Sequence, residues 1–218
     1  MDKEKTFHIE TFGCQMNVND SEKVAGLMLA EGHRRAEGPG DADFVFINTC
    51  AVREKASEKL FHALGRLQKI KQRRELVIGV GGCVAQLQGR AILDRAPQVD
   101  LLVGTHNMAR VPELLRSAGG GAPAAVDLDR STDIFTIPTS AVAHSSAVRA
   151  YVTVIEGCNH VCSFCVVPRT RGPEACRDAA AIVDEASGQC FLIAAFTSAS
   201  VSSSIRRRNF VRCASSRP

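Results

Sequence analysis

Three apolar, strand-like runs in the first half of the chain each end at a cysteine, and this pattern constrains the fold more than any other feature. The cysteines are Cys14, Cys50 and Cys83, separated by 36 and 33 residues. Helix-like patterns follow each of them, such as the apolar steps of three and four between residues 52 and 74. Strands that alternate with helices predict right-handed crossovers and a doubly wound, mostly parallel sheet. Because ligands bind at the carboxyl ends of such strands, we expect the three thiols to converge there.

Two interpretations of these cysteines are open. A single buried cysteine is most often a small apolar core residue. Three cysteines in equivalent positions, however, match the soft thiolate ligands that bind iron-sulphur clusters or zinc. The equivalence of their positions favours a metal site.

A second group of thiols follows the strand expected over residues 149–156. Cys158, Cys162 and Cys165 have C-x-x-x-C-x-x-C spacing within one loop. Three thiolates can hold three corners of a four-iron cluster and leave one iron without a protein ligand. A structural zinc site takes four protein ligands instead. The spacing therefore favours a reactive iron-sulphur cluster over a zinc knuckle or three free thiols.

Local signals place several element boundaries. Asn19 is expected to cap the first helix, and Gly32 lies where a left-handed residue ends one. A helix is expected over residues 85–95 with Leu87 and Ile92 facing inward. The glycines of residues 79–82 lack dinucleotide-binding spacing and are interpreted as a tight turn before the third cysteine.

Composition shifts divide the chain into four parts. Residues 1–117 form an amino-terminal domain, and residues 118–147, rich in Ala, Gly, Ser and Pro, form a linker. Residues 148–186 begin a second domain. Residues 187–218 carry eight serines and no acidic residue, and are expected to be a disordered, irregular tail.

Charge and hydropathy limit the class of protein. No apolar run approaches the length of a membrane span, and no leader is apparent, so we expect a soluble, cytoplasmic protein in a reducing compartment. The net charge of +4 comes from five arginines after Glu185, because residues 1–185 carry 22 basic and 23 acidic groups. Global charge therefore gives no support for nucleic-acid binding. Arg169 and Arg171 either meet a carboxylate or phosphate near the cysteine loop or face solvent.

The cysteine motifs lie in strings that resemble a known family. These strings are TFGCQMNVNDSE, DADFVFINTCAVREKASEKLFHALGRL, VGGCVAQ, VDLLVGT and EGCNHVCSFCVVPRTRG. Together they are similar to the radical S-adenosylmethionine methylthiotransferases over about residues 5–175. The resemblance is strongest to the tRNA branch, which makes 2-methylthio-N6-isopentenyladenosine, whereas the ribosomal-protein branch is the alternative within the family.

The resemblance implies two 4Fe-4S clusters with different tasks. Cys158, Cys162 and Cys165 would hold the cluster whose open iron binds S-adenosylmethionine, and Cys14, Cys50 and Cys83 would hold an auxiliary cluster that provides sulphur. No other catalytic residue is implied. The reaction would insert a methylthio group at C2 of the modified adenosine at position 37 of tRNA, beside the anticodon. The implied partners are tRNA and an electron donor, either a reductase or a flavodoxin-type protein, and we expect a monomer.

The resemblance ends near residues 177–185. The family continues through a (β/α) barrel, of which this chain is expected to supply the first strand and helix. We therefore expect a truncated chain whose activity is in question, and the alternative function is a non-catalytic iron-sulphur binding fragment. Cys176, Cys190 and Cys213 match no family position and are assigned no role.

Overall fold

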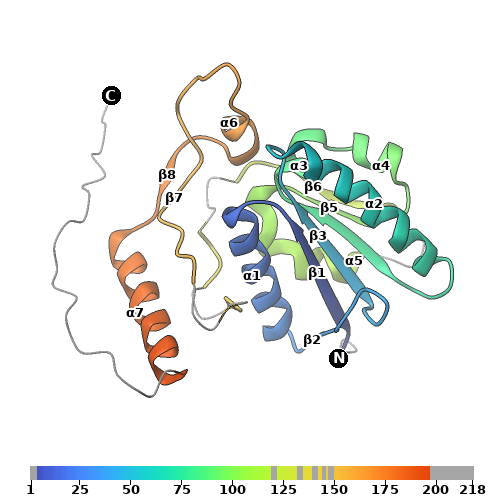
Figure 1. Cartoon of the computed structure of the whole chain (residues 1–218), viewed down its shortest axis with the longest axis horizontal. Coiled ribbons are helices and arrows are strands. Elements are labelled where there is room, and N and C mark those ends of the chain that lie inside the picture. Colours follow the sequence, from blue (N-terminus) through green and yellow to red (C-terminus); the bar gives the residue numbers. More distant parts are fainter. Residues whose placement is uncertain are drawn as a thin grey trace.

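The computed structural model describes residues 4–118, 122–131, 135–138, 142–143, 146 and 150–196. Its largest unit is a six-stranded sheet in which every neighbouring pair of strands is parallel (Figure 1). The strands are β1 (Thr6–Phe12), β2 (Arg34–Arg35), β3 (Phe44–Thr49), β4 (Val77–Gly81), β5 (Leu101–Val103) and β6 (Ala125–Asp127). The predicted doubly wound, parallel sheet is confirmed.

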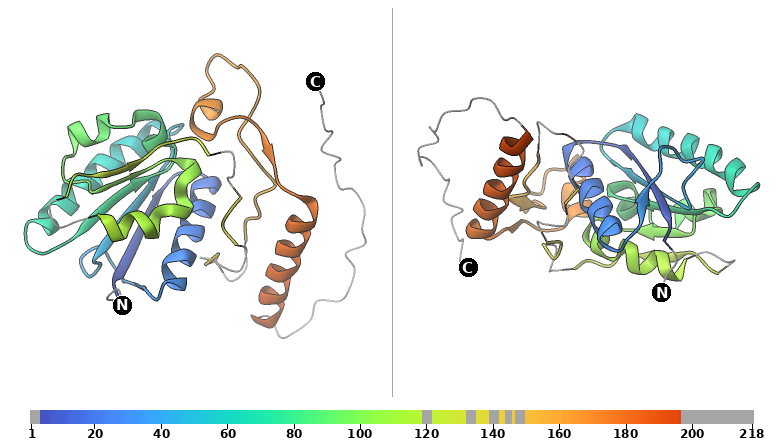
Figure 2. Two further views of the ribbon diagram at one scale, coloured as in Figure 1. Left: turned by 180° about the vertical axis from the view of Figure 1, so that it is seen from behind. Right: turned by 90° about the horizontal axis from the view of Figure 1, so that it is seen from below.

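Helices cover both faces of this sheet (Figure 2). In chain order they are α1 (Gln15–Ala30), α2 (Glu54–Lys71), α3 (Cys83–Gln88), α4 (Ala91–Arg95), the 3-10 helix η1 (Thr105–Arg110) and α5 (Val111–Ser117). Apolar residues of α2, α3 and α4 pack on one face, and those of α1, η1 and α5 pack on the other.

Strand β3 is the centre of the core because both of its faces are buried. All six of its residues are buried, with Phe44 and Phe46 in the cluster under α1, and Val45 and Ile47 in the cluster under α2. Successive side chains of a strand point to opposite faces, so a continuous apolar run fits a strand with helices on both sides.

The strand order β2-β1-β3-β4-β5-β6 reverses its direction of growth once. The chain adds β2 on one side of β1 and then adds β3 on the other side. Ligand sites of doubly wound sheets lie at such a switch point, outside the carboxyl ends of the two strands. In this sheet the switch point lies between β1 and β3, whose last paired residues are Phe12 and Thr49.

Helix α1 ends where the sequence predicts, but it does not begin where the sequence predicts. Gly32 has φ +85°, and the His33 N–H donates to the Met28 carbonyl at 3.0 Å, which is the Schellman pattern. Helix α1 begins at Gln15, so Asn19 is one turn inside it and does not cap it.

The helix expected over residues 85–95 is broken into α3 and α4. Gly89 has φ +56° and ends α3, and the side chain of Leu87 is 37% exposed, whereas Ile92 is buried as expected. The glycine run before Cys83 is also only partly a turn. Gly79 and Gly81 lie in β4, where a Cβ would approach Phe46 to 2.9 and 2.4 Å, so these glycines make room for that ring.

The predicted linker contains a strand. Within residues 118–147, β6 pairs in parallel with β5, and Asp127 accepts a hydrogen bond from the Asn107 side chain at 2.5 Å. The sheet therefore extends ten residues beyond the expected boundary at 117. A strand of only three residues carries too short an apolar alternation to be recognised in sequence.

The second part of the chain is small. It contains β7 (Ile155–Glu156), α6 (Val167–Arg171), β8 (Ala175–Cys176) and α7 (Ala179–Phe196), and β7 pairs antiparallel with β8. The strand expected over residues 149–156 is shorter than predicted. Helix α7 stands apart from the sheet (Figure 2) and continues ten residues past the boundary predicted at 186.

The expectation of an irregular tail from residue 187 is therefore wrong as far as residue 196. Leucine, glutamine and paired alanines in residues 187–196 are good helix formers, which explains the continuation. Residues 197–218 lie outside the described part of the chain. Among the described helices, none combines the length and apolar character that crossing a membrane requires.

Candidate metal centre

The structure brings Cys14, Cys50 and Cys83 to one cavity at the carboxyl edge of the sheet. Cys14 directly precedes α1, Cys50 directly follows β3, and Cys83 is the first residue of α3. All three line a cavity of about 230 Å³. Cys50 and Cys83 are buried, whereas Cys14 is half-buried. None of the three is in a disulfide.

Side-chain amides fix the backbone around this cavity. The Cys14 thiol donates to Asn17 Oδ1 at 3.4 Å. The side chain of Asn17 donates to Asn48 Oδ1 at 2.9 Å, and Asn48 Nδ2 donates back to the Asn17 carbonyl at 2.9 Å. These reciprocal hydrogen bonds join the start of α1 to the end of β3, so the positions of Cys14 and Cys50 are coupled.

Glycine is required immediately before Cys83. Gly82 has φ +91°, and a Cβ at this position would lie 2.3 Å from Asn48 Oδ1. The left-handed turn lets the chain leave β4 and enter α3 within one residue. Cys83 is thereby held next to the end of β3.

The second part of the chain covers the same cavity. Its lining includes Ile155, Glu156 and Gly157 before the cysteine loop, and Val167, Thr170 and Arg171 after it. Asn19 of α1 joins the two parts: its side chain donates to the Tyr151 carbonyl at 2.9 Å and accepts from the Thr153 hydroxyl at 3.0 Å.

A buried ion cluster connects the two parts beside Cys83. Arg171 Nη2 lies 2.5 Å from Asp20 Oδ2, and Arg171 Nη1 lies 3.4 Å from Glu156 Oε2. Each of the three side chains is 5% exposed. Of the two arginines that were expected either to meet an anion or to face solvent, Arg171 meets carboxylates and Arg169 is exposed.

This cluster changes the ionisation of its neighbours. Burial raises the pKa of the Cys83 thiol, and the nearby positive charge of Arg171 opposes that rise. Burial also raises the pKa of Glu156; Asp20 adds to the increase and Arg171 opposes it. Burial disfavours the charged form of Arg171, but Asp20, Cys83 and Glu156 together outweigh it, so the pKa of Arg171 lies above its ordinary value. Arg171 is therefore a permanent positive charge next to the thiols.

Cys158, Cys162 and Cys165 lie together on the loop between β7 and α6, but none of them lines the cavity. Cys162 is exposed, and the other two are half-buried. The Cys165 N–H donates to the Cys162 carbonyl at 3.1 Å, which closes a turn. At the base of the loop, the Cys158 N–H donates to the Gly172 carbonyl at 3.2 Å.

Within the described residues, no three His, Cys, Asp or Glu side chains form a ready-made metal-binding group. The donor chemistry nevertheless fits iron-sulphur clusters, because each set offers three soft thiols and no fourth ligand. Both ligand sets therefore stay predictions. Of the cysteines without an assigned role, Cys176 is exposed in β8, Cys190 falls within α7 and Cys213 lies outside the described residues.

The roles of Asp20 and Glu156 were not predicted from the sequence. For Asp20, the available signal was the polar run around it. Residues 17–22 of α1 run Asn-Val-Asn-Asp-Ser-Glu, and five of these six residues are polar. A polar run inside a helix is usually interpreted as a solvent-facing surface. These five polar residues are buried instead. Asn17 and Ser21 contact the end of β3, and Asn19 and Asp20 contact the second part of the chain.

Comparison with known proteins agrees with these motifs. Residues 6–104 match the model of the uncharacterized protein family UPF0004. The chain is 46% identical over 187 residues to a protein of Geobacter metallireducens named tRNA-2-methylthio-N(6)-dimethylallyladenosine synthase. Proteins with the same name from Solibacter usitatus and Geobacter sulfurreducens are 46% and 42% identical over 186 and 190 residues.

These alignments cover 84–85% of this chain but only 41–42% of each relative. The chain thus spans less than half the length of the curated relatives it matches. Residues 6–104 are thus similar to the UPF0004 family, and most of the chain is similar to part of proteins named tRNA-2-methylthio-N(6)-dimethylallyladenosine synthase.

Proposed function

We propose that the chain carries the cluster-binding part of a radical S-adenosylmethionine tRNA methylthiotransferase. The observation that supports this most is the shared cavity: thiols from the ends of three neighbouring strands line it, and the segments on either side of the C-x-x-x-C-x-x-C loop cover it. Such an arrangement sets a thiol site in the sheet beside a thiol site on a loop, as two cooperating clusters require.

Each set of residues has a distinct task in this proposal. Cys158, Cys162 and Cys165 hold one 4Fe-4S cluster and leave one iron to bind S-adenosylmethionine. Cys14, Cys50 and Cys83 hold the auxiliary cluster. When bound, the two clusters supply reductive cleavage of S-adenosylmethionine and a sulphur atom for C2 of the adenine.

The protein's own residues position these sites. The side chain of Arg171 is buried between the two parts of the chain and holds α6 against α1 through Asp20. The same guanidinium lies next to Cys83 and favours its thiolate, the form that binds iron. Ile155 and Val167 are apolar walls of the cavity.

The relatives' names support tRNA as the substrate class and methylthio transfer as the reaction. The proposal includes an electron donor, which is a reductase or a flavodoxin-type protein, and a monomeric protein.

Iron content of anaerobically reconstituted protein tests the two-site arrangement. Replacing Cys158, Cys162 and Cys165 with alanine should leave about half the iron, because the sheet site is independent of the loop. Cys176→Ala is the matched control and should keep all of it. A loss of all iron in the triple variant, or no loss at all, would contradict the two sites.

A second candidate is iron-sulphur binding without turnover, and the exposure of the loop favours it. Phe164 and Val161 of this loop are 92% and 97% exposed, whereas radical chemistry needs a closed pocket. Incubation with reductant, S-adenosylmethionine and tRNA carrying isopentenyladenosine separates the two functions. Methylthio nucleoside formed over several turnovers supports the enzyme, and bound iron with neither cleavage of S-adenosylmethionine nor product supports the second candidate.

A further inference from the structure

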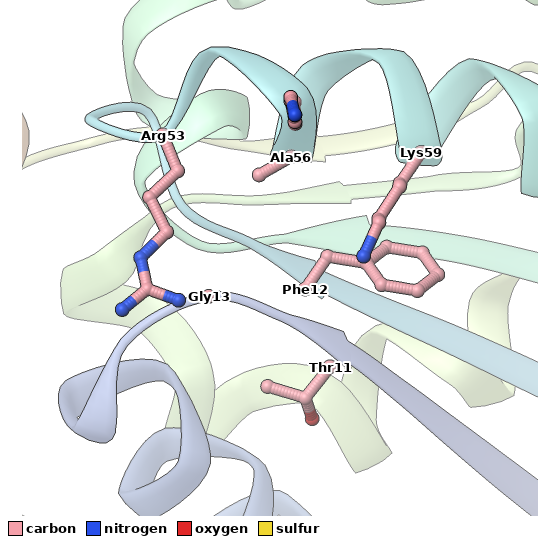
Figure 3. A pocket seen from close by; sticks show the side chains of 7 residues that line it. Thr11, Phe12, Gly13, Arg53, Ala56 and Lys59 are labelled. Atoms are coloured by element: carbon pink, nitrogen blue, oxygen red, sulfur yellow. The ribbon is translucent and has the colours of Figure 1, made fainter.

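A second cavity lies beside Cys14 and is not used by the proposed chemistry. Its volume is about 520 Å³, and it opens between the end of β1 and the first turns of α2 (Figure 3). Thr11, Phe12 and Gly13 form one wall, and residues of α2 and its cap form the other. That second wall consists of Arg53, Lys55, Ala56 and Lys59.

The wall from α2 is strongly positive. Figure 3 shows Arg53 extending from the start of the helix toward Gly13, and Lys59 extending toward Phe12. All three basic side chains are exposed, and none forms an ion pair with a carboxylate among the residues that the structure describes. Among the side chains that the structure describes, no acidic one lines the cavity.

Three other basic residues near α2 pair with carboxylates. Arg66 pairs with Glu10 at 3.1 Å, Lys71 with Asp100 at 2.5 Å and Arg74 with Asp43 at 3.9 Å. The basic residues at the start of α2 differ from these, because they line a cavity and have no described counter-ion. Several positive charges around one cavity are the electrostatic pattern of an anion site.

Three cations around one cavity suit a phosphate better than a single carboxylate. A phosphate offers several oxygens in a tetrahedral arrangement, so one guanidinium and two ammonium groups can bind it together. Phosphates of nucleic-acid backbones are bound by Arg, Lys and main-chain N–H groups in this way.

The position of the cavity indicates which phosphate it takes. Gly13 lines the cavity and is followed directly by Cys14 of the thiol site. An adenosine presented to that site brings its neighbouring phosphates to this edge of the sheet. We propose that the cavity of Arg53, Lys55 and Lys59 seats a backbone phosphate of the substrate RNA, next to the nucleotide that reacts. This proposal rests on the proposed function.

RNA binding by the 218-residue chain tests the proposal. The probe is an RNA hairpin with isopentenyladenosine in its loop, titrated at several salt concentrations. Arg53→Gln/Lys59→Gln should weaken binding about tenfold, and the slope of log affinity against log salt should fall by about one. The matched control is Lys69→Gln/Arg73→Gln, which removes the same charges in the last turn of α2 and just after it, and should change affinity less than about twofold.

Other outcomes have distinct meanings. Equal weakening by both double variants, no weakening by either, or no RNA binding by the unmodified chain would overturn the proposal. The proposal would also be overturned if Arg53→Gln/Lys59→Gln lost binding of inorganic phosphate but kept binding of RNA. Iron content and RNA-independent cleavage of S-adenosylmethionine report on the proposed function separately, and both should be unchanged in Arg53→Gln/Lys59→Gln.

Discussion

At the scale of single residues, Arg171 is the side chain on which the joining of the two parts depends most. It lies between Asp20 and Glu156, and all three are 5% exposed. A buried pair contributes little net stability while it is complete, because desolvation offsets the attraction. Removing one member leaves the other charges buried and uncompensated, which costs far more.

We therefore expect Arg171→Gln to lower the free energy of unfolding by about 3–5 kcal/mol. Urea denaturation measures this change, and faster proteolysis between residues 128 and 154 would accompany it. Arg169→Gln is the control, since Arg169 is an exposed arginine of the same helix, and should change stability by less than about 0.5 kcal/mol. Equal effects of the two substitutions would show that the ion cluster is not a connection between the parts.

At the scale of elements, the turn between β4 and α3 decides where Cys83 lies. Gly82 combines φ +91° with a position at which a Cβ would lie 2.3 Å from Asn48 Oδ1 and 2.7 Å from the Thr49 carbonyl oxygen. Any side chain there forces α3 away from the end of β3. The amide pair between Asn17 and Asn48 would be disturbed at the same time.

Gly82→Ala should consequently destabilise the protein by about 1–3 kcal/mol and reduce iron bound at the sheet site. Gly65→Ala is the matched control in α2, where an added Cβ meets no atom within 4 Å. It should stabilise the protein by about 0.5–1 kcal/mol, because alanine is the better helix former. Thermal unfolding and iron content of both variants check these expectations, and an unaffected Gly82→Ala protein would show that the turn tolerates a side chain.

At the scale of the whole molecule, the six-stranded sheet is the unit with its own core. Buried apolar clusters cover both of its faces, and β6 closes its edge against β5. A fragment of residues 1–130 should therefore unfold cooperatively, whereas a fragment of residues 1–117 should have a lower Tm, because it leaves the β5 edge unpaired. Circular dichroism melts compare the two. Equal melting temperatures would mean that β6 adds nothing to the sheet.

Much of this molecule follows from the sequence because its signals are local. The apolar run of β3 and the spacing of Leu60, Leu64 and Leu67 in α2 report directly which faces are buried. One β-α-β unit between successive cysteines was sufficient to predict that Cys14, Cys50 and Cys83 reach the same edge, because parallel strands end on the same side of a sheet. The spacing of Cys158, Cys162 and Cys165 likewise predicts a set of cluster ligands on their loop.

Only the tertiary structure decided the features that depend on partners far apart in the chain. Asp20 and Arg171 are 151 residues apart, and nothing local distinguishes a carboxylate buried against an arginine from one facing water. The same is true of Asn19, which resembles a helix cap and instead joins the two parts of the chain. Strand β6 is too short to have a pattern and exists because β5 offers an edge. The sequence determined the order of the elements and the chemistry of the thiols, whereas long-range pairing of charges and strand edges determined how the sheet and the cysteine loop meet.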